Sequence, residues 1–451
     1  MRYATGFAVA VALTIVPTAG TRAVELHRHR SLSSEPVIYW SHEAQRAIVP
    51  AGPGGVFGTE NVGNKFPGEA AVYMGIVHAA IYDAAVAIEG GYQPYAIAID
   101  APPHASPAAA IATAAHHTLV GSPEIGLQGL QPALGLTPEQ HESFDADYES
   151  YMSTIPEGAG KRAGIRVGEQ VAIAILMLRR NDGRESNPTL ADLNPPAPGP
   201  GVWEQNPGTP LPPVLGLRLP EMTPLALVTA SQFRPSGPTA LTSAEYAEDF
   251  DQVKELGRFD SAVRTPKQTT EALFWTDHDL RQWNDGMNRL ALAHRLDLVQ
   301  TARMLAMAHV SGGDAMIGCF DAKYFYWFWR PYRAIPQADA DGNAATTADS
   351  TWVPLRDTPN FPEYPSAHAC HTGAVAEALR TFFGTDQVSF SLDSRVTGTL
   401  RQYDRFHDVV KDVKKARILA GFHFRNSDRE GAILGRKVAR FVVSHLFRPI
   451  D

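Results

Sequence analysis

The 451-residue sequence predicts a mostly α-helical fold, arranged as a large helical bundle. Several long segments carry apolar residues at helical spacing between capping and terminating residues, and few segments alternate with the period of two that is typical of a strand. The composition, with 44% hydrophobic and 20% charged residues, supplies enough apolar material for a large core. We therefore expect a folded helical protein rather than a disordered chain.

Helices are predicted first in the N-terminal half. Residues 69–88 are rich in Ala, Val, Ile and Met, and the pair Gly90-Gly91 follows as a stop signal. Residues 137–140 combine an N-cap Thr, a first-turn Pro and a capping-box Gln, which predicts a helix up to about Met152. Another helix is expected over residues 160–180.

A long connection divides the chain. Residues 187–224 contain many Pro and Gly residues and no clear periodicity, which favours an irregular segment. The chain also exceeds the size at which a single hydrophobic core usually stops growing. We therefore predict an N-terminal helical scaffold over residues 24–224 and a C-terminal domain over residues 225–451.

The C-terminal half contains further helical signals. Thr242 and Glu245 have the spacing of a capping box. Residues 296–329 predict one long helix or two, with the pair Gly312-Gly313 as the weak point. Residues 369–383 predict another helix.

The charge balance limits the possible partners. A net charge of −8 and a pI near 6.1 argue against a general surface for nucleic acid or for an anionic membrane. Any strongly cationic feature must therefore be local. No membrane span is predicted after the N-terminus, because the best candidate, residues 70–88, contains His78 and Asp83.

The N-terminal residues 1–23 have the layout of a secretory signal peptide. Arg2 precedes an apolar run over residues 4–16, and small residues follow up to Ala23. The run is short for a transmembrane helix. This order predicts an exported protein, secreted or periplasmic, with cleavage near Gly20 or Ala23.

The first of three candidate site motifs spans residues 323–331. Lys323 and Arg330 are seven residues apart, two helical turns, so we expect them on nearly the same helix face, where both can point at one anion. The residues between them are all aromatic, which makes this segment poorly suited to solvating free charges. The alternative is that both side chains reach the solvent along the surface.

The second motif places Ser366 and His368 at the start of the helix predicted over residues 369–383. Free backbone N–H groups and the positive end of the helix dipole favour an anion at such a start, and a hydroxyl and an imidazole add donors. The alternative is that Ser366 is a plain N-cap and His368 an ordinary helix-start histidine.

The third motif sets Arg417 and His423 on either side of Gly421, shortly before residues 427–430, which have the pattern of a capping box for a last helix. Arg417 supplies a forked donor for an anion. A lone histidine in such a place is more often structural than catalytic. The three motifs together, within about a hundred residues, predict one cationic pocket for a tetrahedral oxyanion, vanadate or phosphate.

This combination resembles the vanadium-dependent haloperoxidases and their relatives, the type 2 phosphatidic acid phosphatases and the bacterial class A acid phosphatases. Residues 323–331 match the family pattern Lys-x6-Arg-Pro, residues 365–368 match Pro-Ser-Gly-His, and residues 417–423 match Arg-x5-His. Residues 73–83 and 320–324 also look like segments of exported haloperoxidase-type proteins. The resemblance implies a helical bundle of the haloperoxidase and acid phosphatase type.

Some positions depart from the family pattern. Ala367 stands where the family has glycine, so a backbone N–H contact there must tolerate a Cβ, and Ala416 stands where the family has serine. Neither change removes a ligand. Many phosphatases carry Asp four residues after the last histidine, where this chain has Ser427 and then Asp428, and this difference favours the peroxidase branch.

The resemblance implies vanadate as the cofactor, although phosphate can occupy the same site. Lys323, Arg330 and Arg417 would neutralise the oxygens of the anion through charge-assisted hydrogen bonds. Ser366 would add another donor, and His423 would be the axial metal ligand.

The implied catalytic residues are His368, Lys323 and His423. His368 would act as the acid/base group, and Lys323 would polarise the activated peroxide. The second ring nitrogen of His423 needs an acceptor that holds the imidazole in place, for which Asp277 and Asp314 are candidates.

The implied activity is the oxidation of a halide by hydrogen peroxide to hypohalous acid, followed by halogenation of a small organic acceptor. Phe361 and Phe320 are plausible walls of the pocket mouth. The same pocket could instead hydrolyse phosphate monoesters, with His423 as a nucleophile that forms a phosphohistidine. A third alternative is a non-catalytic exported oxyanion-binding protein, against which the presence of both His368 and His423 argues.

Cys319 and Cys370 are the two cysteines of the chain. Two cysteines do not make a disulfide framework, so core packing must stabilise the fold. Each lies near a site motif, and their pairing stays open. Beside an oxidant we expect them to be buried, paired or sacrificially oxidised.

Overall fold

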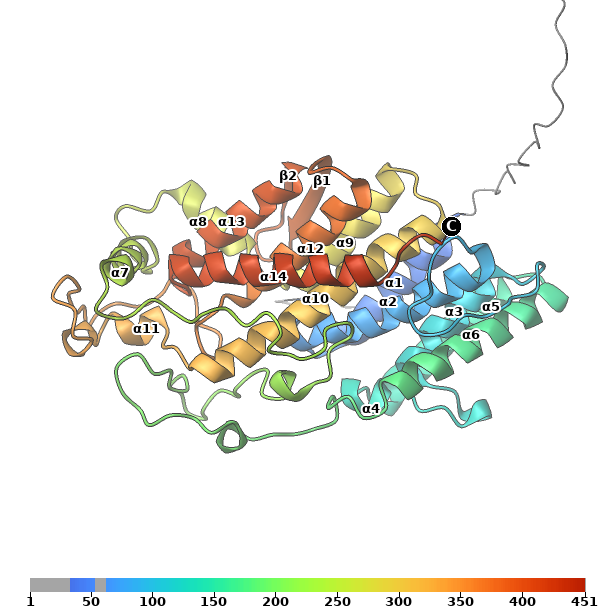
Figure 1. Ribbon diagram of the computed structural model, residues 1–451, viewed down its shortest axis with the longest axis horizontal. Helices are drawn as coiled ribbons and strands as arrows, with labels where there is room; N and C mark the ends of the chain where they lie inside the picture. Colours follow the sequence, from blue (N-terminus) through green and yellow to red (C-terminus); the bar gives the residue numbers. More distant parts are fainter. Residues whose placement is uncertain (1–32, 53–61, 451) are drawn as a thin grey trace, which may run out of the picture. The chain divides into compact units, whose positions relative to one another are not determined.

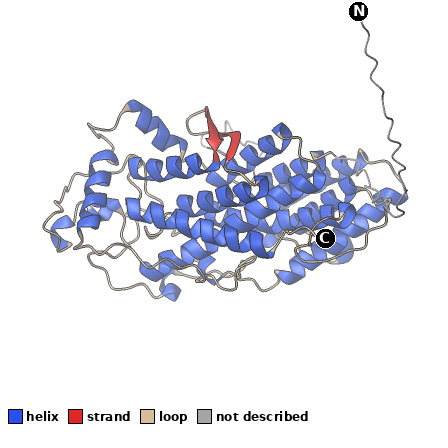
Figure 2. Ribbon diagram, turned by 45° about the horizontal axis from the view of Figure 1, so that its top comes forward, coloured by secondary structure: helices blue, strands red, loops and turns tan. Residues whose placement is uncertain are grey.

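The computed structural model of the protein describes residues 33–52 and 62–450. Its described residues belong to one compact unit, Ser33–Asp451. Helices dominate this unit, and the strands of the described residues form one two-stranded sheet (Figures 1 and 2). The predicted mostly α-helical bundle is confirmed, whereas the predicted signal peptide, residues 1–23, lies outside the described residues.

The elements follow one another along the chain in this order. They are α1 (Glu35–Ile48), α2 (Pro67–Glu89), α3 (Pro107–Val120), η2 (Pro123–Ile125), α4 (Gln131–Leu134), α5 (Pro138–Ser153), α6 (Ala159–Leu178), η3 (Leu190–Leu193), η4 (Leu219–Glu221), α7 (Ala244–Leu256), α8 (Pro266–Phe274), α9 (Asp279–Ala293), α10 (Leu298–Tyr326), α11 (Pro331–Ala334), η5 (Ala338–Ala340), α12 (Ala367–Phe383), β1 (Gln387–Ser394), β2 (Thr399–Arg405), α13 (Phe406–Leu419) and α14 (Arg425–His445).

The long helices α2 and α10 pack against each other at the core of the bundle, and α10 also packs against α12 and α14 (Figure 1). Small residues allow the close approach of α2 and α10. A Cβ on Gly75 would lie 3.1 Å from the carbonyl oxygen of His309, and one on Gly313 would lie 3.1 Å from that of Ala71. Both glycines therefore allow the close packing of α2 against α10 and do not serve as flexible points.

Among the described residues, α2 is the helix long and apolar enough to cross a membrane, with 23 residues and a mean hydropathy of 1.6 in its most apolar window. Within the fold, 89% of that window is buried. Its apolar character is thus accounted for by packing in the core.

Several predicted helices are present. The capping box of Thr137 and Gln140 begins α5 as predicted, because the Thr137 hydroxyl accepts the Gln140 N–H while the Gln140 side chain accepts the Thr137 N–H. The segment predicted as one or two helices forms the single helix α10, which is continuous through Gly312 and Gly313. Its N-cap is Asp297.

Two predicted capping boxes are wrong. α7 begins one residue later than expected, because the N-cap is Ser243, whose hydroxyl accepts the N–H of Tyr246 at 3.1 Å. α14 begins at Arg425, so Ser427 lies inside the first turn, where its hydroxyl binds Glu363 instead of capping the helix.

The predicted connection over residues 187–224 is irregular apart from the short segments η3 and η4. Contacts unite both sides of it in the same compact unit. The division into an N-terminal scaffold and a C-terminal domain stays a prediction.

Candidate active site

The three predicted motifs meet where α10 ends, α12 begins and the chain turns from α13 into α14. Lys323 lies in the last turn of α10, but that helix stops at Tyr326, and Trp327 takes a left-handed conformation with φ of 52°. Arg330 is the residue that precedes α11. The predicted shared helix face is therefore wrong: Lys323 and Arg330 converge because the chain turns between them. Neither side chain reaches the solvent, since both residues are 0% exposed.

The ammonium of Lys323 is held by three backbone carbonyls. Its Nζ donates to the oxygens of Pro362 at 2.8 Å, Glu363 at 2.9 Å and Pro365 at 2.5 Å. Burial lowers the pKa of Lys323 to about 8, and the nearby charge of Arg330 acts in the same direction. Lys323 thus ties the end of α10 to the loop before α12 and contributes a buried positive charge.

Arg330 joins that loop to His423. Its Nε donates to the oxygen of Phe361 at 3.0 Å, and its Nη1 lies 2.9 Å from the oxygen of Phe422 and 3.1 Å from Nε2 of His423. Nη2 of Arg330 is buried and has no hydrogen-bond partner among the described residues. A buried guanidinium nitrogen without an acceptor is costly, so this atom indicates a place for an anion.

The acceptor that orients His423 is Glu363. Nδ1 of His423 lies 2.9 Å from Oε1 of Glu363, which also accepts the N–H of Phe424 at 3.0 Å, while Oε2 accepts the hydroxyl of Ser427. The two expected candidates are wrong for this role: Asp314 accepts the backbone N–H groups of residues 225–227, and the carboxylate of Asp277 binds arginines. When Nδ1 carries the proton, Nε2 is left as the lone-pair nitrogen that a metal ligand requires.

Burial dominates the electrostatics of this pair. It lowers the pKa of His423 well below the ordinary value, and the charges of Arg330 and Lys323 act in the same direction. Burial likewise raises the pKa of Glu363 to about 7, although Ser427 and Arg330 favour its carboxylate. His423 is therefore neutral near neutral pH, as metal coordination or nucleophilic attack requires.

Gly421 makes the turn that brings Arg417 and His423 to one place. Its φ is 79°, and a Cβ there would lie 2.6 Å from the carbonyl oxygen of Gly257. Only glycine fits both the conformation and the close approach.

Ser366 is the residue before α12, and its hydroxyl does not cap the helix. Its N–H instead donates to the oxygen of Ser427 at 3.1 Å. The hydroxyl is buried beside the carboxyl group of Asp428 and makes no hydrogen bond of good geometry with the described residues. Burial raises the pKa of Asp428 well above its usual range, whereas the neighbouring hydroxyl of Ser366 favours its carboxylate.

His368 lies on the first turn of α12 and lines a cavity. Its Nε2 is buried and has no partner among the described residues. The backbone of Asp277 hydrogen-bonds to the imidazole, and therefore to the other ring nitrogen, Nδ1. Burial, followed by the charge of Arg417, lowers the pKa of His368 to about 3, so the imidazole is neutral and its Nε2 carries a lone pair.

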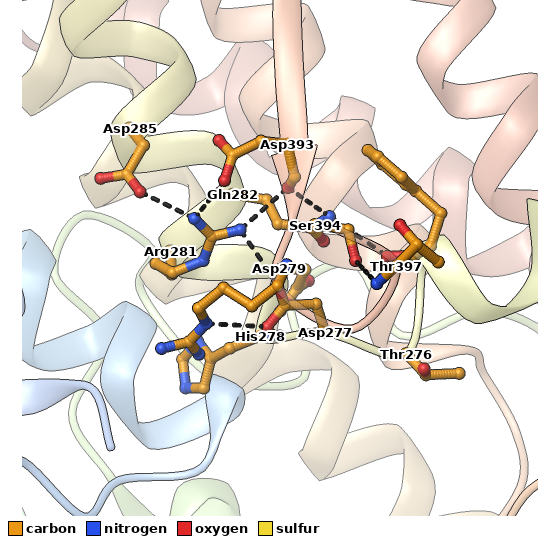
Figure 3. A network of polar contacts seen from close by, with 12 residues as sticks. Thr276, Asp277, His278, Asp279, Arg281, Gln282, Asp285, Asp393, Ser394 and Thr397 are labelled. Carbon is orange, nitrogen blue, oxygen red and sulfur yellow. Dashed lines mark hydrogen bonds and ion pairs between the residues drawn. The ribbon is translucent and has the colours of Figure 1, made fainter. Parts of the chain in front are cut away.

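The Asp277–Asp279 segment that supports His368 is itself fixed by an ionic network around Arg281 (Figure 3). Arg281 donates to Asp277 at 3.0 Å, to Asp285 at 2.9 Å and to Asp393 at 2.6 Å. Asp279 binds Nδ1 of His371 at 3.0 Å. The segment therefore holds its place beside α12 through contacts that reach the sheet.

The carboxylate of Asp279 faces the histidines of α12. Burial alone raises its pKa, but the imidazoles of His368 and His371 outweigh burial and lower the pKa below its usual range. Asp279 is therefore a negative charge beside His368.

Arg417 adds the third cation. Its Nη1 donates to the oxygen of Trp275 at 2.7 Å, and its Nε is buried without a partner among the described residues. The residue is 2% exposed, and burial lowers its pKa to about 10. Lys323, Arg330 and Arg417 thus place three buried positive charges around His423.

A cavity of about 890 Å³ opens onto this cluster. His368, Arg417 and His423 line it directly, whereas Lys323 and Arg330 lie behind the surface of the cavity. The apolar part of the lining includes the two predicted wall residues, Phe320 and Phe361, together with Phe66, Leu215, Met316 and Phe422.

The arrangement fits a tetrahedral oxyanion. Donor atoms without partners belong to Arg330 and Arg417, and the charges of both residues lie near His423, whose Nε2 carries the lone pair. Buried polar groups are normally paired, so several unpaired ones in one place indicate a bound group that supplies acceptors. Vanadate and phosphate both meet this requirement.

Sequence reasoning missed Glu363 and the role of Asp279. Glu363 lies in the Pro-Glu-Tyr-Pro stretch before Ser366, where a single acidic residue among apolar ones was an available signal. Asp279 had no such signal, because its partner His371 is 92 residues away.

The chain is similar to known proteins in sequence and in fold. Residues 303–451 match a family described as the VCPO second helical-bundle domain. A vanadium chloroperoxidase from Curvularia inaequalis is 28% identical over 149 residues, which cover 27% of this chain and 24% of that relative. The chain therefore matches about a quarter of the length of this curated relative.

Solved structures share the fold over nearly the whole chain. A bacterial vanadium-dependent iodoperoxidase has a TM-score of 0.71 at 21% identity and covers 93% of this chain and 98% of that chain. A bacterial vanadium-dependent chloroperoxidase of apo type has a TM-score of 0.64 at 15% identity and covers 86% and 97%. Its holo type has a TM-score of 0.64 at 16% identity and covers 91% and 95%.

Proposed function

We propose that this chain, which belongs to the vanadium haloperoxidase superfamily, binds vanadate and oxidises a halide with hydrogen peroxide to hypohalous acid. The observation that carries the proposal is His423, whose Nδ1 is held by Glu363 at 2.9 Å and whose Nε2 faces the buried cations. A neutral, oriented imidazole beside unpaired donors is the arrangement that coordination of vanadate requires.

The described side chains have different roles in binding the anion. Arg330 and Arg417 donate to the oxygens of the anion, Lys323 adds positive charge, and Ser366 adds a hydroxyl donor. Bound vanadate supplies a Lewis acid that activates peroxide without a change in its own oxidation state.

His368 is the proton acceptor of the proposed reaction. Its Nε2 takes a proton from hydrogen peroxide, and the neighbouring carboxylate of Asp279 stabilises the imidazolium that forms. In the overall reaction, hydrogen peroxide, a halide ion and a proton give hypohalous acid and water. The proton that His368 takes from hydrogen peroxide can then be transferred to the leaving oxygen, which departs as water.

The cavity has room for the further substrates. Its volume of about 890 Å³ and its phenylalanine-rich wall suit a small organic acceptor beside the oxidising site. Peroxide and halide are much smaller and reach His368 and Arg417 along the same surface. The export of the protein and its two-part organisation remain proposals from the sequence.

Phosphate ester hydrolysis is a second candidate function. The pair of Glu363 and His423 also suits a nucleophilic histidine, because the carboxylate would stabilise the imidazole during attack on phosphorus. For this reaction His368 would first have to gain a proton at Nε2, which it would then give to the leaving group. Phosphate and vanadate have nearly the same shape, so the anion site alone serves both reactions.

The test incubates the purified protein with orthovanadate and hydrogen peroxide, and follows the oxidation of iodide, bromide and chloride separately. Hydrolysis of para-nitrophenyl phosphate is measured in parallel without vanadate. The matched variants are His423→Ala and, on the surface of α14, His445→Ala.

Vanadate-dependent oxidation of a halide that disappears in H423A and survives in H445A supports the proposal. If the protein releases phosphate, vanadate inhibits this release and no halide is oxidised, the phosphatase function replaces the haloperoxidase proposal. An inactive protein that still binds vanadate through His423 is instead an oxyanion-binding protein.

A further inference from the structure

Two cysteine thiols lie one helical turn from Lys323 and Ser366, two residues of the proposed anion site. Cys319 on α10 and Cys370 on α12 are free, 0% exposed and hydrogen-bonded to each other. The thiol of Cys319 also lies 3.7 Å from the carbonyl oxygen of Pro365. The same carbonyl oxygen accepts a hydrogen bond from Lys323, whose Nζ lies 2.5 Å from it. One backbone oxygen therefore separates the thiol pair from a residue of the proposed oxyanion site.

The two helices present the thiols in equivalent positions. Cys319 precedes Lys323 by one helical turn on α10, and Cys370 follows Ser366 by one turn at the start of α12. A link between the thiols would therefore join α10, which carries Lys323, to α12, which begins directly after Ser366.

We propose that Cys319 and Cys370 form a redox-active pair, which hydrogen peroxide converts into a disulfide that links α10 to α12. Two thiols and one hydrogen peroxide give one disulfide and two waters. One thiolate attacks a peroxide oxygen, which breaks the O–O bond and leaves a sulfenic acid. The second thiol then displaces water from that sulfur and closes the disulfide.

The surroundings favour Cys319 as the attacking sulfur. Burial raises the pKa of its thiol, but the hydrogen bond with Cys370 and the charges of Lys323 and Arg330 outweigh burial and lower it. Burial raises the pKa of Cys370 well above its usual range, which favours Cys370 as the second thiol, the one that closes the disulfide.

Pairing determines the fate of the oxidised sulfur. A sulfenic acid without a neighbouring thiol proceeds to sulfinic and sulfonic acids, which are charged and irreversible. Such a charge at Cys319 would compete with the oxyanion for Lys323. The disulfide is neutral and reversible, so it protects the anion site while peroxide is present. This inference rests on the proposed function only in taking hydrogen peroxide as the oxidant that reaches the pocket.

The experiment exposes the full-length protein to hydrogen peroxide without vanadate or halide, and then counts thiols in denaturant. Peptide mass spectrometry without reduction identifies the products. We expect both thiols to disappear, a linked peptide pair with a mass about 2 Da below the sum of the two, and recovery of both thiols with dithiothreitol. The wild-type measurement needs no variant to fold.

The control variants are Cys370→Ser and Cys319→Ser, and each is compared with the wild type after the same exposure. C370S should acquire sulfinic or sulfonic acid at Cys319 and lose vanadate affinity by roughly tenfold or more, while the wild type keeps its affinity. Persistence of both thiols in the wild type, separate acids on the two residues, or a link between two molecules would overturn the proposal. Because neither thiol counting nor mass analysis uses turnover, these outcomes stand apart from failure of the haloperoxidase function.

Discussion

Glu363 Oε1 lies 2.9 Å from Nδ1 of His423, although the two residues are 60 positions apart in the sequence. Glu363 also accepts the N–H of Phe424 and the hydroxyl of Ser427, so both of its oxygens are engaged on the segment that carries His423. The carboxylate therefore fixes both the orientation of the imidazole and the start of α14.

The first prediction concerns this pair. Glu363→Gln should weaken vanadate binding by about 10- to 100-fold, because a neutral amide holds the ring less firmly and makes Nε2 less basic. Titration of the purified protein with vanadate, followed by tryptophan fluorescence, measures the change. Glu245→Gln at an exposed ion pair is the matched control. Unchanged affinity in E363Q would show that the carboxylate is structural only.

The second prediction separates binding from proton transfer. His368→Ala should reduce peroxide-dependent halide oxidation by about 10²- to 10⁴-fold, because the proton acceptor is lost. Vanadate affinity should change far less than in His423→Ala, since His368 is placed as an acid/base group and not as a ligand. Parallel vanadate titrations and initial rates measure the two effects. Equal losses of affinity in both variants would contradict this division of roles.

The third prediction concerns the effect of the buried cation Arg417 on anion affinity and on the stability of the protein without ligand. Arg417→Met should lower phosphate and vanadate affinity by roughly 10- to 100-fold, because a charge-assisted donor is lost. Without ligand the variant should be as stable as the wild type or more stable, because Arg417 is buried with one hydrogen bond and an unpartnered Nε.

Isothermal calorimetry and thermal unfolding measure the two effects of R417M. Arg425→Met, at a side chain that is 51% exposed, is the control. A large fall in Tm without ligand, together with unchanged anion affinity, would assign Arg417 a structural role instead.

The fourth prediction concerns pH and lies away from the site. Asp314 is buried on α10 and accepts three backbone N–H groups of residues 225–227, yet burial raises its pKa from 3.8 to about 6. The folded protein therefore holds a proton that the unfolded chain releases near pH 3.8. The stability that this proton contributes is present below that pH and is lost as the pH rises through about 6.

Relative to Asp314→Asn, the wild type should thus lose roughly 3 kcal/mol of unfolding free energy between acid and neutral pH. Urea unfolding of both proteins across this range measures the difference. A difference that is independent of pH, or that grows with pH, would contradict the raised pKa.

How much the sequence determined is clearest at the three motifs. Ser366, at a helix start, was identified correctly because the Pro-Ser-Ala-His stretch and the apolar residues that follow are local signals. Arg417 and His423 were assigned to one pocket because three motifs occur together within about a hundred residues, and both residues line the same cavity. Helical periodicity also predicted the fold class, because it depends on residues three and four positions apart.

The tertiary structure alone decided the rest. Lys323 and Arg330 were expected on one helix face, but the left-handed Trp327 ends the helix and the turn brings both cations together. Glu363 and Asp279 meet their histidines over 60 and 92 residues, and no local periodicity encodes such pairs. The sequence by itself therefore determined the helical fold class and the candidate site residues, whereas long-range packing decided which partner holds each of them, because burial and hydrogen bonding depend on segments that meet only in the folded chain.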